Sequence, residues 1–415
     1  MLSRYRKLDP FTRNIIFVFI GGSLGNFLNL LYQLLIAHSL SAIDFAAFNS
    51  LLAIFMLIST PIGTIQLAIA KYLSVYRAKA QDNKVTFLVS DLIKKASILG
   101  ILTLIIFLAL AAFIVGSLKI DSLSCGYILA LLLASACLGP VLGGSMQGLE
   151  LFGWMVSASL LSGIIKLGLT ALLLFLGFKI AGALGAFLIA NLIVIIIGWL
   201  AVRKNIDFSE TKKEFNYKEM LLYLFPIAIS NMCFIWLVSF DMVLVKYFFS
   251  ANESGAYSLA QMLGKIFLFL PGAISLVMFP RTSGLNAVSQ DTRSVLRKSL
   301  FYAFCLCLLA TLVYNVVPSF ALRILTGKAL PESIFLGRLF SISMSFFALT
   351  FVLINYFLSI KDFRFIKFLV LSVILQFSAI LLFHHNLIEI QIILCINSIL
   401  TFALGYYLAF YKRKR

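Results

Sequence analysis

The sequence predicts an all-α polytopic membrane protein with about twelve transmembrane helices in two six-helix lobes. Of its 415 residues, 62% are hydrophobic and only 12% are charged, and apolar runs long enough to cross ~30 Å of hydrocarbon recur along the chain. A soluble domain carries about 25% charged residues. The composition therefore excludes a water-soluble globular enzyme. It also excludes a nucleic-acid binder despite the net charge of +18, because basic patches of that kind lie on a soluble fold.

Twelve apolar segments are separated by charged or turn-rich breaks. They lie near residues 14–37, 45–70, 93–117, 124–147, 151–176, 180–202, 219–245, 254–280, 296–317, 333–359, 365–384 and 387–410. Each has about the 20 residues that a membrane helix needs. The charged connection at 203–218 divides the set in two, so we expect an N-terminal lobe over 1–205 and a C-terminal lobe over 206–415.

The basic residues predict the orientation of these spans, because cytoplasmic loops hold the excess of Lys and Arg in membrane proteins. With the N-terminus inside, most of the 34 basic residues fall on inner segments. The outer segments hold only Lys119, Lys179, Lys246, Arg323, Lys328 and Arg338. This alternation favours an even number of spans and places both termini in the cytoplasm.

The cysteines indicate neither a disulfide framework nor a metal site. All six lie in or beside apolar runs, without the paired spacing that such sites show. The chain also has no phosphate-binding glycine loop and no nucleophile motif. We therefore expect no metal, no organic cofactor and no enzymatic activity.

An internal repeat relates the two halves. Residues 40–48 (LSAIDFAAF) and 249–257 (FSANESGAY) share a serine, an acid three residues later and an aromatic residue four further on, at an offset of 209. Pro61 and Pro271 follow at nearly the same distance. Chance together with ordinary helix capping is the alternative explanation, since acids are favoured at helix N-termini. Because six spans separate the copies, the halves share one orientation and predict a parallel pseudo-twofold repeat.

Polar side chains recur at helical spacing within several spans. Such lanes are Gly22, Asn26, Asn29 and Gln33 in the first span, Ser159, Ser162, Lys166 and Thr170 in the fifth, and Ser254, Ser258, Gln261 and Lys265 in the eighth. Steps of three and four keep these side chains on one helix face. Hydrogen bonds between packed helices are one explanation. The presence of Asn, Gln and Lys in lanes of both halves favours a water-filled cavity.

Charged residues inside the spans are the strongest functional signal, since each costs roughly 2.5–3.5 kcal/mol at a helix centre. Lys265 lies ten residues past Gly255, about 15 Å along a helix, which places it near the midplane. Lys166 lies in the outer half of its span, where its side chain alternatively reaches outward to the interface. Asp241 lies near an outer helix end, either as a functional carboxylate or paired with Lys246. Two cations and one peripheral acid suit an anionic ligand.

The chain resembles a known transporter family. Residues 241–260 (DMVLVKYFFSANESGAYSLA), with Pro271 and 276–280 (LVMFP), are similar to the seventh-to-eighth helix signature of the polysaccharide flippases. These form the Wzx-type branch of the multidrug/oligosaccharidyl-lipid/polysaccharide exporter (MOP) superfamily. Residues 40–48 resemble the turn between the first and second helices of the same proteins.

The resemblance implies a V-shaped, MATE-like pair of lobes around a central cavity, which opens alternately inward and outward. Its substrate would be an oligosaccharide on a polyprenyl diphosphate of the undecaprenyl type, a repeat unit of O-antigen, capsule or exopolysaccharide. It would act as a multi-pass protein of the bacterial cytoplasmic (inner) membrane, driven by a proton or sodium gradient. Its partners would be the lipid bilayer, a polysaccharide polymerase and chain-length proteins.

Under this interpretation the singled-out residues take specific roles. Lys265 and Lys166 would bind the diphosphate, and Asp241 would couple transport to an ion. The glycan would contact the amides of Asn26, Asn29, Gln33 and Gln261, and a cytoplasmic vestibule would be formed by Arg13, Lys71 and Arg281. The chain lacks two further helices and the cavity arginines of the related peptidoglycan-precursor flippases, which argues against that substrate.

Three alternatives stay open. A multidrug/cation antiporter of the same superfamily would want buried acids facing its substrate, and only Asp241 is available. A membrane glycosyltransferase or glycan polymerase normally needs catalytic residues on a sizeable outer loop. A non-transporting membrane component of a glycan-assembly complex would need none of these features.

Overall fold

The computed structural model describes residues 10–205, 217–269 and 271–411, and each regular element in these ranges is a helix. The chain forms two compact units. Unit 1 comprises Met1–Ser39 and Ile58–Phe225, and unit 2 comprises Leu40–Leu57 and Pro226–Arg415. Residues 40–57 thus pack with the C-terminal part of the chain. The division into lobes at 1–205 and 206–415 stays a prediction, because residues 206–216, which follow the predicted boundary, lie outside the described residues.

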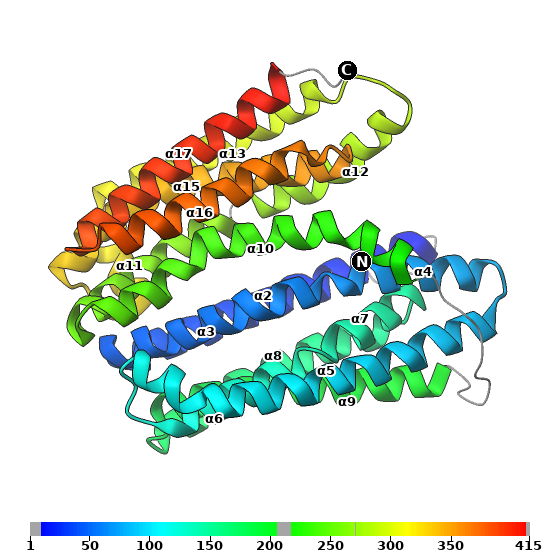
Figure 1. The fold of residues 1–415 in the computed structure, drawn as a ribbon, viewed down its shortest axis with the longest axis horizontal. Coiled ribbons are helices and arrows are strands. Elements are labelled where there is room, and N and C mark those ends of the chain that lie inside the picture. Colours follow the sequence, from blue (N-terminus) through cyan, green and yellow to red (C-terminus); the bar gives the residue numbers. More distant parts are fainter. Residues whose placement is uncertain (1–9, 206–216, 270, 412–415) are drawn as a thin grey trace, which may run out of the picture. The chain divides into compact units, whose positions relative to one another are not determined.

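Unit 1 is a bundle of long helices that run side by side (Figure 1). Its helices are α2 (Pro10–Ser39), α4 (Ile65–Ala78), α5 (Asp82–Ser117), α6 (Leu123–Ser135), α7 (Gly139–Gly148), α8 (Phe152–Phe175) and α9 (Lys179–Asn205). Two further helices, α3 (Ala42–Gly63) and α10 (Tyr217–Phe248), each have residues in both units.

Small residues set the packing distance between helices in unit 1. Gly144 and Gly148 lie one turn apart on α7, and a Cβ at Gly144 would come within 2.7 Å of the Gln66 carbonyl oxygen on α4. At Gly148 it would come within 2.8 Å of Leu73. Lipid tails are as apolar as leucine, so membrane helices associate through close van der Waals packing of this kind.

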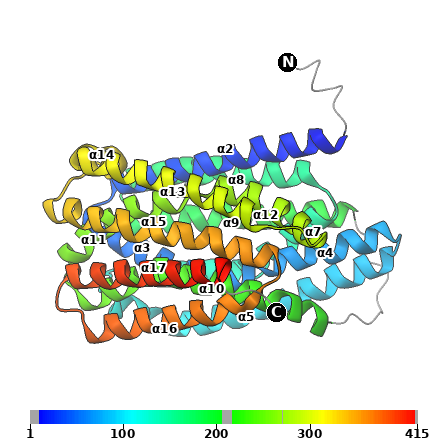
Figure 2. The ribbon, with the colours of Figure 1, turned by 90° about the horizontal axis from the view of Figure 1, so that it is seen from above.

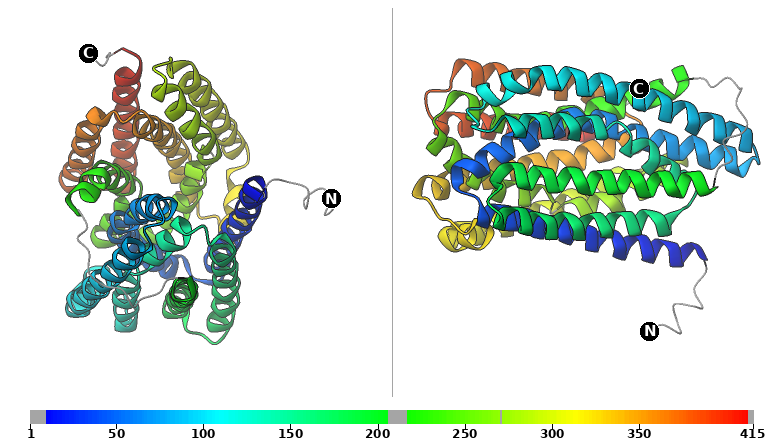
Figure 3. Two further views of the ribbon diagram at one scale, coloured as in Figure 1. Left: turned by 90° about the vertical axis from the view of Figure 1, so that its right-hand side faces the viewer. Right: turned by 90° about the horizontal axis from the view of Figure 1, so that it is seen from below.

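Unit 2 is the second helical bundle, seen end on in Figure 3. Besides the larger part of α10, it contains α11 (Ala251–Phe269), α12 (Gly272–Ala287), α13 (Arg293–Val316), α14 (Pro318–Thr326), α15 (Pro331–Ser359), η1 (Phe363–Phe365), α16 (Ile366–Leu382) and α17 (Leu387–Phe410). The ends of α12 and α17 lie at one end of this unit, and the start of α11 lies at the opposite end (Figures 1 and 2).

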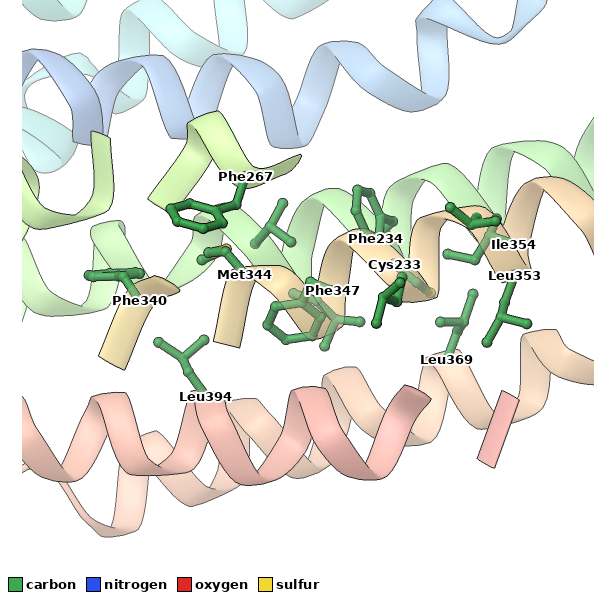
Figure 4. Close-up of a cluster of buried hydrophobic side chains, with 14 of the residues drawn as sticks. Cys233, Phe234, Phe267, Phe340, Met344, Phe347, Leu353, Ile354, Leu369 and Leu394 are labelled. Carbon is green, nitrogen blue, oxygen red and sulfur yellow. The ribbon is translucent and has the colours of Figure 1, made fainter. Parts of the chain in front are cut away.

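The core of unit 2 is built around α15. Phe340, Met344 and Phe347 on this helix are fully buried. Figure 4 shows them facing side chains from neighbouring helices, among them Phe267 of α11 and Leu394 of α17. Within the described ranges, α15 has the largest buried share of all the candidate spans, 67%, as expected of a helix at the centre of a bundle.

The all-α membrane fold is confirmed. Within the described ranges, eleven helical segments are long and apolar enough to cross a membrane by length and composition. The predicted span 254–280 falls on α11 and α12 and includes residue 270, outside the described residues, and it is not among the eleven. Two other predicted spans are also broken: 45–70 divides between α3 and α4, and 124–147 between α6 and α7.

The two copies of the internal repeat fold into the same local structure. The Ser41 hydroxyl accepts a hydrogen bond from the Asp44 backbone N–H (3.0 Å) and donates to the Asp44 carboxylate (2.9 Å). Ser250 and Glu253 form the equivalent pair, in which the hydroxyl donates to the carboxylate at 2.6 Å. Both are N-terminal capping interactions, which satisfy backbone donors in the first turn of a helix. The helix capping suggested by the sequence is therefore present in both copies.

Candidate functional site

A polar cluster in unit 1 surrounds Lys166. This residue lies on α8 and is only 9% exposed. Its ammonium donates a hydrogen bond to Oδ1 of Asn29 on α2 and lies 4.5 Å from the ring centre of Tyr32 and 5.3 Å from that of Phe187. Aromatic faces attract cations, most strongly where water is excluded. Lys166 is therefore held between helices and does not extend outward to the interface.

Close contact between α2 and α8 brings their two polar lanes together. A Cβ at Gly25 would approach the Ser159 hydroxyl to 2.6 Å, and one at Gly163 would approach Leu28 to 2.9 Å. The Tyr32 hydroxyl donates to the carbonyl of Ala183 on α9 (3.1 Å), which fixes the ring beside the lysine. The lanes predicted for the first and fifth spans thus face each other.

The other two amides of the first lane remain accessible. Asn26 is exposed and Gln33 is half-buried. Within the described ranges neither side chain makes a hydrogen bond, whereas Asn29 is engaged by Lys166. A ligand in this lane would therefore meet two unengaged amides and one cation.

A second polar cluster, in unit 2, surrounds Asp241. This carboxylate on α10 is fully buried. It accepts hydrogen bonds from the Tyr257 hydroxyl (2.6 Å) and from the Gln261 amide (3.0 Å to each oxygen). Lys265 lies one turn beyond Gln261 on α11, is half-buried, and acts electrostatically on the carboxylate. The Asp241 side chain is thus directed at the polar lane of α11.

Two groups in this cluster are left without partners. The Gln261 side-chain oxygen has no hydrogen-bond partner among the described residues. In the same part of the chain, Lys265 makes no hydrogen bond and no ion pair within 4 Å. Buried polar atoms are nearly always satisfied, so the unpaired Gln261 oxygen is an exception that a bound polar ligand would satisfy.

Reasoning from the sequence missed a third set of polar residues. The Gln376 amide donates to the Leu237 carbonyl (2.9 Å) and its oxygen accepts from Asn397 (2.8 Å), while Thr401 donates to Ser372 (2.8 Å). A cavity of about 10 Å³ adjoins both Gln376 and Asp241. The available signal was the spacing of four between Ser372 and Gln376 and between Asn397 and Thr401.

The three predicted vestibule residues lie on α2, α4 and α12, which belong to different units. Lys71 is an exposed residue of α4 in unit 1, and Arg281 is an exposed residue of α12 in unit 2. Arg13 belongs to α2, and its side chain lies outside the described residues. The vestibule stays a prediction, as does joint binding of one ligand by Lys166 and Lys265, because each residue is described within its own unit.

Within the described ranges, no three His, Cys, Asp or Glu side chains lie close enough together to hold a metal ion. The polar clusters instead consist of lysines, amides, hydroxyls and one carboxylate. Such groups bind and release an anionic or hydroxyl-rich ligand without covalent chemistry.

Comparison with known proteins assigns the family. A family model described as "polysaccharide biosynthesis protein" matches residues 11–286. The chain belongs to this family. Over 205 residues it is also 26% identical to a putative O-antigen transporter of Shigella flexneri, in a match that covers 48% of each protein. The chain thus spans about half the length of this curated relative in the match.

Solved structures show the same fold at low identity. A multidrug resistance MATE family transporter of the MOP superfamily, in an inward-facing conformation, matches with a TM-score of 0.74 and 15% identity over 93% of this chain and 94% of its own. The lipid II flippase MurJ, in an inward closed conformation, matches with 0.70 and 14% identity over 94% and 87%. This family member therefore has a MATE-like membrane fold.

Proposed function

We propose that this protein is a flippase that moves a polyprenyl-diphosphate-linked oligosaccharide across the bacterial cytoplasmic membrane by alternating access. The observation that carries the proposal is the cluster around Lys166, in which a buried ammonium faces a lane of amides inside a membrane bundle. Membership of the polysaccharide biosynthesis family supports this substrate class. So does the similarity to a putative O-antigen transporter.

The chemistry of the clusters suits the two ends of such a substrate. A lysine ammonium in a region of low dielectric attracts a diphosphate strongly. The amides of Asn26 and Gln33, which are not engaged by other described side chains, offer both donors and acceptors to sugar hydroxyls. The polyprenyl chain needs no polar site, because it remains in the bilayer throughout.

The cluster in unit 2 contributes a second cation and the coupling group. Lys265 would complete the diphosphate site, with Gln261 beside it. Asp241 is the acid that we assign to ion coupling, because it lies within hydrogen-bonding reach of α11, which also carries Lys265. Protonation, or sodium bound at this carboxylate, would change the charge next to the substrate lysine.

The test is complementation of a bacterial strain that lacks its own O-antigen flippase. Wild-type protein should restore surface glycan, whereas Lys166→Met and Lys265→Ala should each abolish export while the protein still accumulates in the membrane. Lys361→Ala, at an exposed position between α15 and η1, is the matched control and should export normally.

The same strains distinguish transport from its alternatives. Lipid-linked oligosaccharide should accumulate on the cytoplasmic leaflet in the two lysine variants, as measured by access of a membrane-impermeant lectin to spheroplasts and inverted vesicles. Full export by both variants would contradict the proposal. Loss of drug resistance with unchanged glycan export would instead support a multidrug antiporter.

A further inference from the structure

A groove in unit 2 lies outside the clusters described so far. It has a volume of about 510 Å³ and is formed by the facing sides of α12 and α13, which lie side by side in Figure 2. From α12 it is lined by Ile274, Val277 and Arg281, at helical spacing. From α13 it is lined by Lys298, Ser299 and Tyr302. Arg281 lies nearer the end of α12 than Ile274 and Val277, and Lys298 lies nearer the start of α13 than Tyr302.

The charged end of the groove carries two cations and no acid. Arg281 and Lys298 line it from opposite helices, and none of its lining residues is Asp or Glu. Within the described part of the chain, neither cation forms an ion pair within 4 Å. An arginine fork and a lysine ammonium on two sides of one concavity match the tetrahedral oxygens of a phosphate group.

A buried hydroxyl points to a ligand independently of the charges. Ser299 is only 7% exposed, yet its hydroxyl makes no hydrogen bond within the described ranges. Several buried serines in the helices donate to a carbonyl three or four residues earlier, as Ser145 does to Val141 at 2.8 Å. The Ser299 hydroxyl instead faces the groove, one residue from Lys298. A phosphate oxygen bound by the two cations would also satisfy this hydroxyl.

The other end of the groove carries exposed side chains that are largely apolar. Val277 is 71% exposed and Tyr302 is 59% exposed. In a membrane helix, exposed apolar side chains face lipid tails. A ligand entering from this side therefore carries an apolar chain, and its polar group reaches the end of the bilayer where Arg281 and Lys298 lie. In the predicted orientation this end faces the cytoplasm.

We infer that the groove between α12 and α13 binds an anionic phospholipid of the adjacent leaflet, with the lipid phosphate held by Arg281, Lys298 and Ser299. A glycerophospholipid suits this groove better than the transported oligosaccharide does. No Asn or Gln side chain lines the groove to bind sugar hydroxyls, and all of its lining residues belong to unit 2. The site is therefore a resident lipid site, and it does not depend on the identity of the transported molecule.

The experiment measures lipid binding to the purified full-length protein in detergent by native mass spectrometry. Dioleoyl phosphatidylglycerol is titrated, with dioleoyl phosphatidylcholine as the lipid control. The wild type should bind one phosphatidylglycerol molecule about tenfold more tightly than the double variant Arg281→Gln/Lys298→Gln, since hydrogen bonds to charged groups are the strong ones. Ser299→Val, which changes shape little, should weaken the same binding event without altering charge.

The controls separate a built site from general attraction of lipid to a basic surface. Arg297→Gln/Lys367→Gln removes two exposed cations of the same unit that do not line the groove, and it should bind like the wild type. Equal loss in this control, or no loss in Arg281→Gln/Lys298→Gln, would overturn the inference. Displacement of the lipid by millimolar inorganic phosphate would also overturn it, in favour of a free-anion site. Preferential binding of undecaprenyl diphosphate would do so in favour of a substrate-loading site.

Discussion

Lys166 is compensated by neutral groups alone. Its ammonium meets one amide oxygen and two aromatic rings, and no carboxylate of the described chain lies within 4 Å of it. A cation at a membrane helix centre costs roughly 2.5–3.5 kcal/mol. A desolvated cation–π contact returns about 2 kcal/mol, and a charged hydrogen bond returns about 1.5–3 kcal/mol. Because the compensation is neutral, the full positive charge remains to attract an anion.

Asp241 shows the opposite arrangement, a buried charge surrounded by donors. Tyr257 and Gln261 satisfy both carboxylate oxygens, and Lys265 supplies the opposite charge nearby. Removing one member of such a cluster leaves the others uncompensated in a medium of low dielectric, which is more damaging than the loss of one contact.

We predict that Asp241→Asn and Tyr257→Phe have separable effects. Tyr257→Phe removes one hydrogen bond, and with it about 1.5–3 kcal/mol of stability, but it keeps the charge and should retain gradient-driven export. Asp241→Asn keeps the shape but removes the charge, so export should persist only weakly and should no longer respond to the proton or sodium gradient. Both are measured by glycan export in vesicles with imposed gradients.

Loss of gradient dependence in Tyr257→Phe would contradict the assignment of coupling to the carboxylate. So would an intact gradient response in Asp241→Asn. Protein abundance and unfolding of each variant in detergent provide the control for stability.

At the residue scale, polar spacing predicted which side chains deserve notice, but not their partners. The lanes of the first and fifth spans place Asn29 and Lys166 on helix faces, and the two side chains do meet. Tyr32 and Phe187 were not predicted, because aromatic residues are equally common on lipid-facing surfaces. Gln376 was also missed, because its partners Leu237 and Asn397 lie on other helices and the sequence alone does not show which helices pack together.

The two copies of the internal repeat begin their helices with the same capping interaction. The capping pairs at Ser41 and Ser250 begin α3 and α11 in the same way. By contrast, Ser122 precedes α6 at the N-cap position without a capping hydrogen bond from its side chain. The two kinds of serine provide an internal comparison.

We predict that Ser41→Ala and Ser250→Ala each destabilise the protein by about 1 kcal/mol, since loss of an N-cap costs about 0.5–2 kcal/mol. Ser122→Ala should be close to neutral. Reversible unfolding in mixed micelles measures the three free energies of unfolding. An effect of Ser122→Ala as large as that of the other two would show that capping is not the cause.

Breaks within spans were less predictable than the spans themselves. The predicted span 93–117 lies within α5, which the structure shows as one unbroken helix of 36 residues. Hydropathy cannot show that 124–147 divides into α6 and α7, because both pieces are apolar. Proline removes a backbone donor, yet Pro61 is accommodated inside α3 and Pro226 inside α10, whereas Pro271 directly precedes α12. Packing against neighbouring helices decides between a kink and a break.

At the scale of the whole molecule, α3 belongs to both units. The larger part of α3, through Leu57, packs with unit 2. Asn49 donates a hydrogen bond to Ser258 (2.8 Å), and a Cβ at Gly255 would lie 3.1 Å from the backbone of Ala42. Asn49 and Ser258 are separated by 209 residues, the offset of the internal repeat, so equivalent positions of the two halves contact each other.

We predict that Asn49→Cys/Ser258→Cys forms a disulfide readily and that export continues after it forms. Both residues belong to unit 2, so the bond joins segments that move together. The measurement is copper–phenanthroline crosslinking, followed by glycan export with and without reductant, in a background without the six native cysteines. A crosslink that arrests export would contradict the assignment of this part of α3 to unit 2.

The fold class followed from hydropathy and composition, which are properties of the chain read locally, whereas the orientation predicted from charge stays a prediction. The distribution of residues 40–57 did not follow from such properties. Nothing in their composition distinguishes a helix that packs with its own half from one that packs with the other, since the partner of Asn49, Ser258, lies 209 residues away.

The division of α3 also bears on how such a chain arose. A single ancestral half, expressed alone, would leave the first part of its second helix without the neighbours that Asn49 finds here. It would complete its packing by exchanging that segment with another copy, as a domain-swapped homodimer. Fusion of two copies would turn this exchange between chains into a contact within one chain. A fragment ending at residue 205 should therefore self-associate or fail to fold.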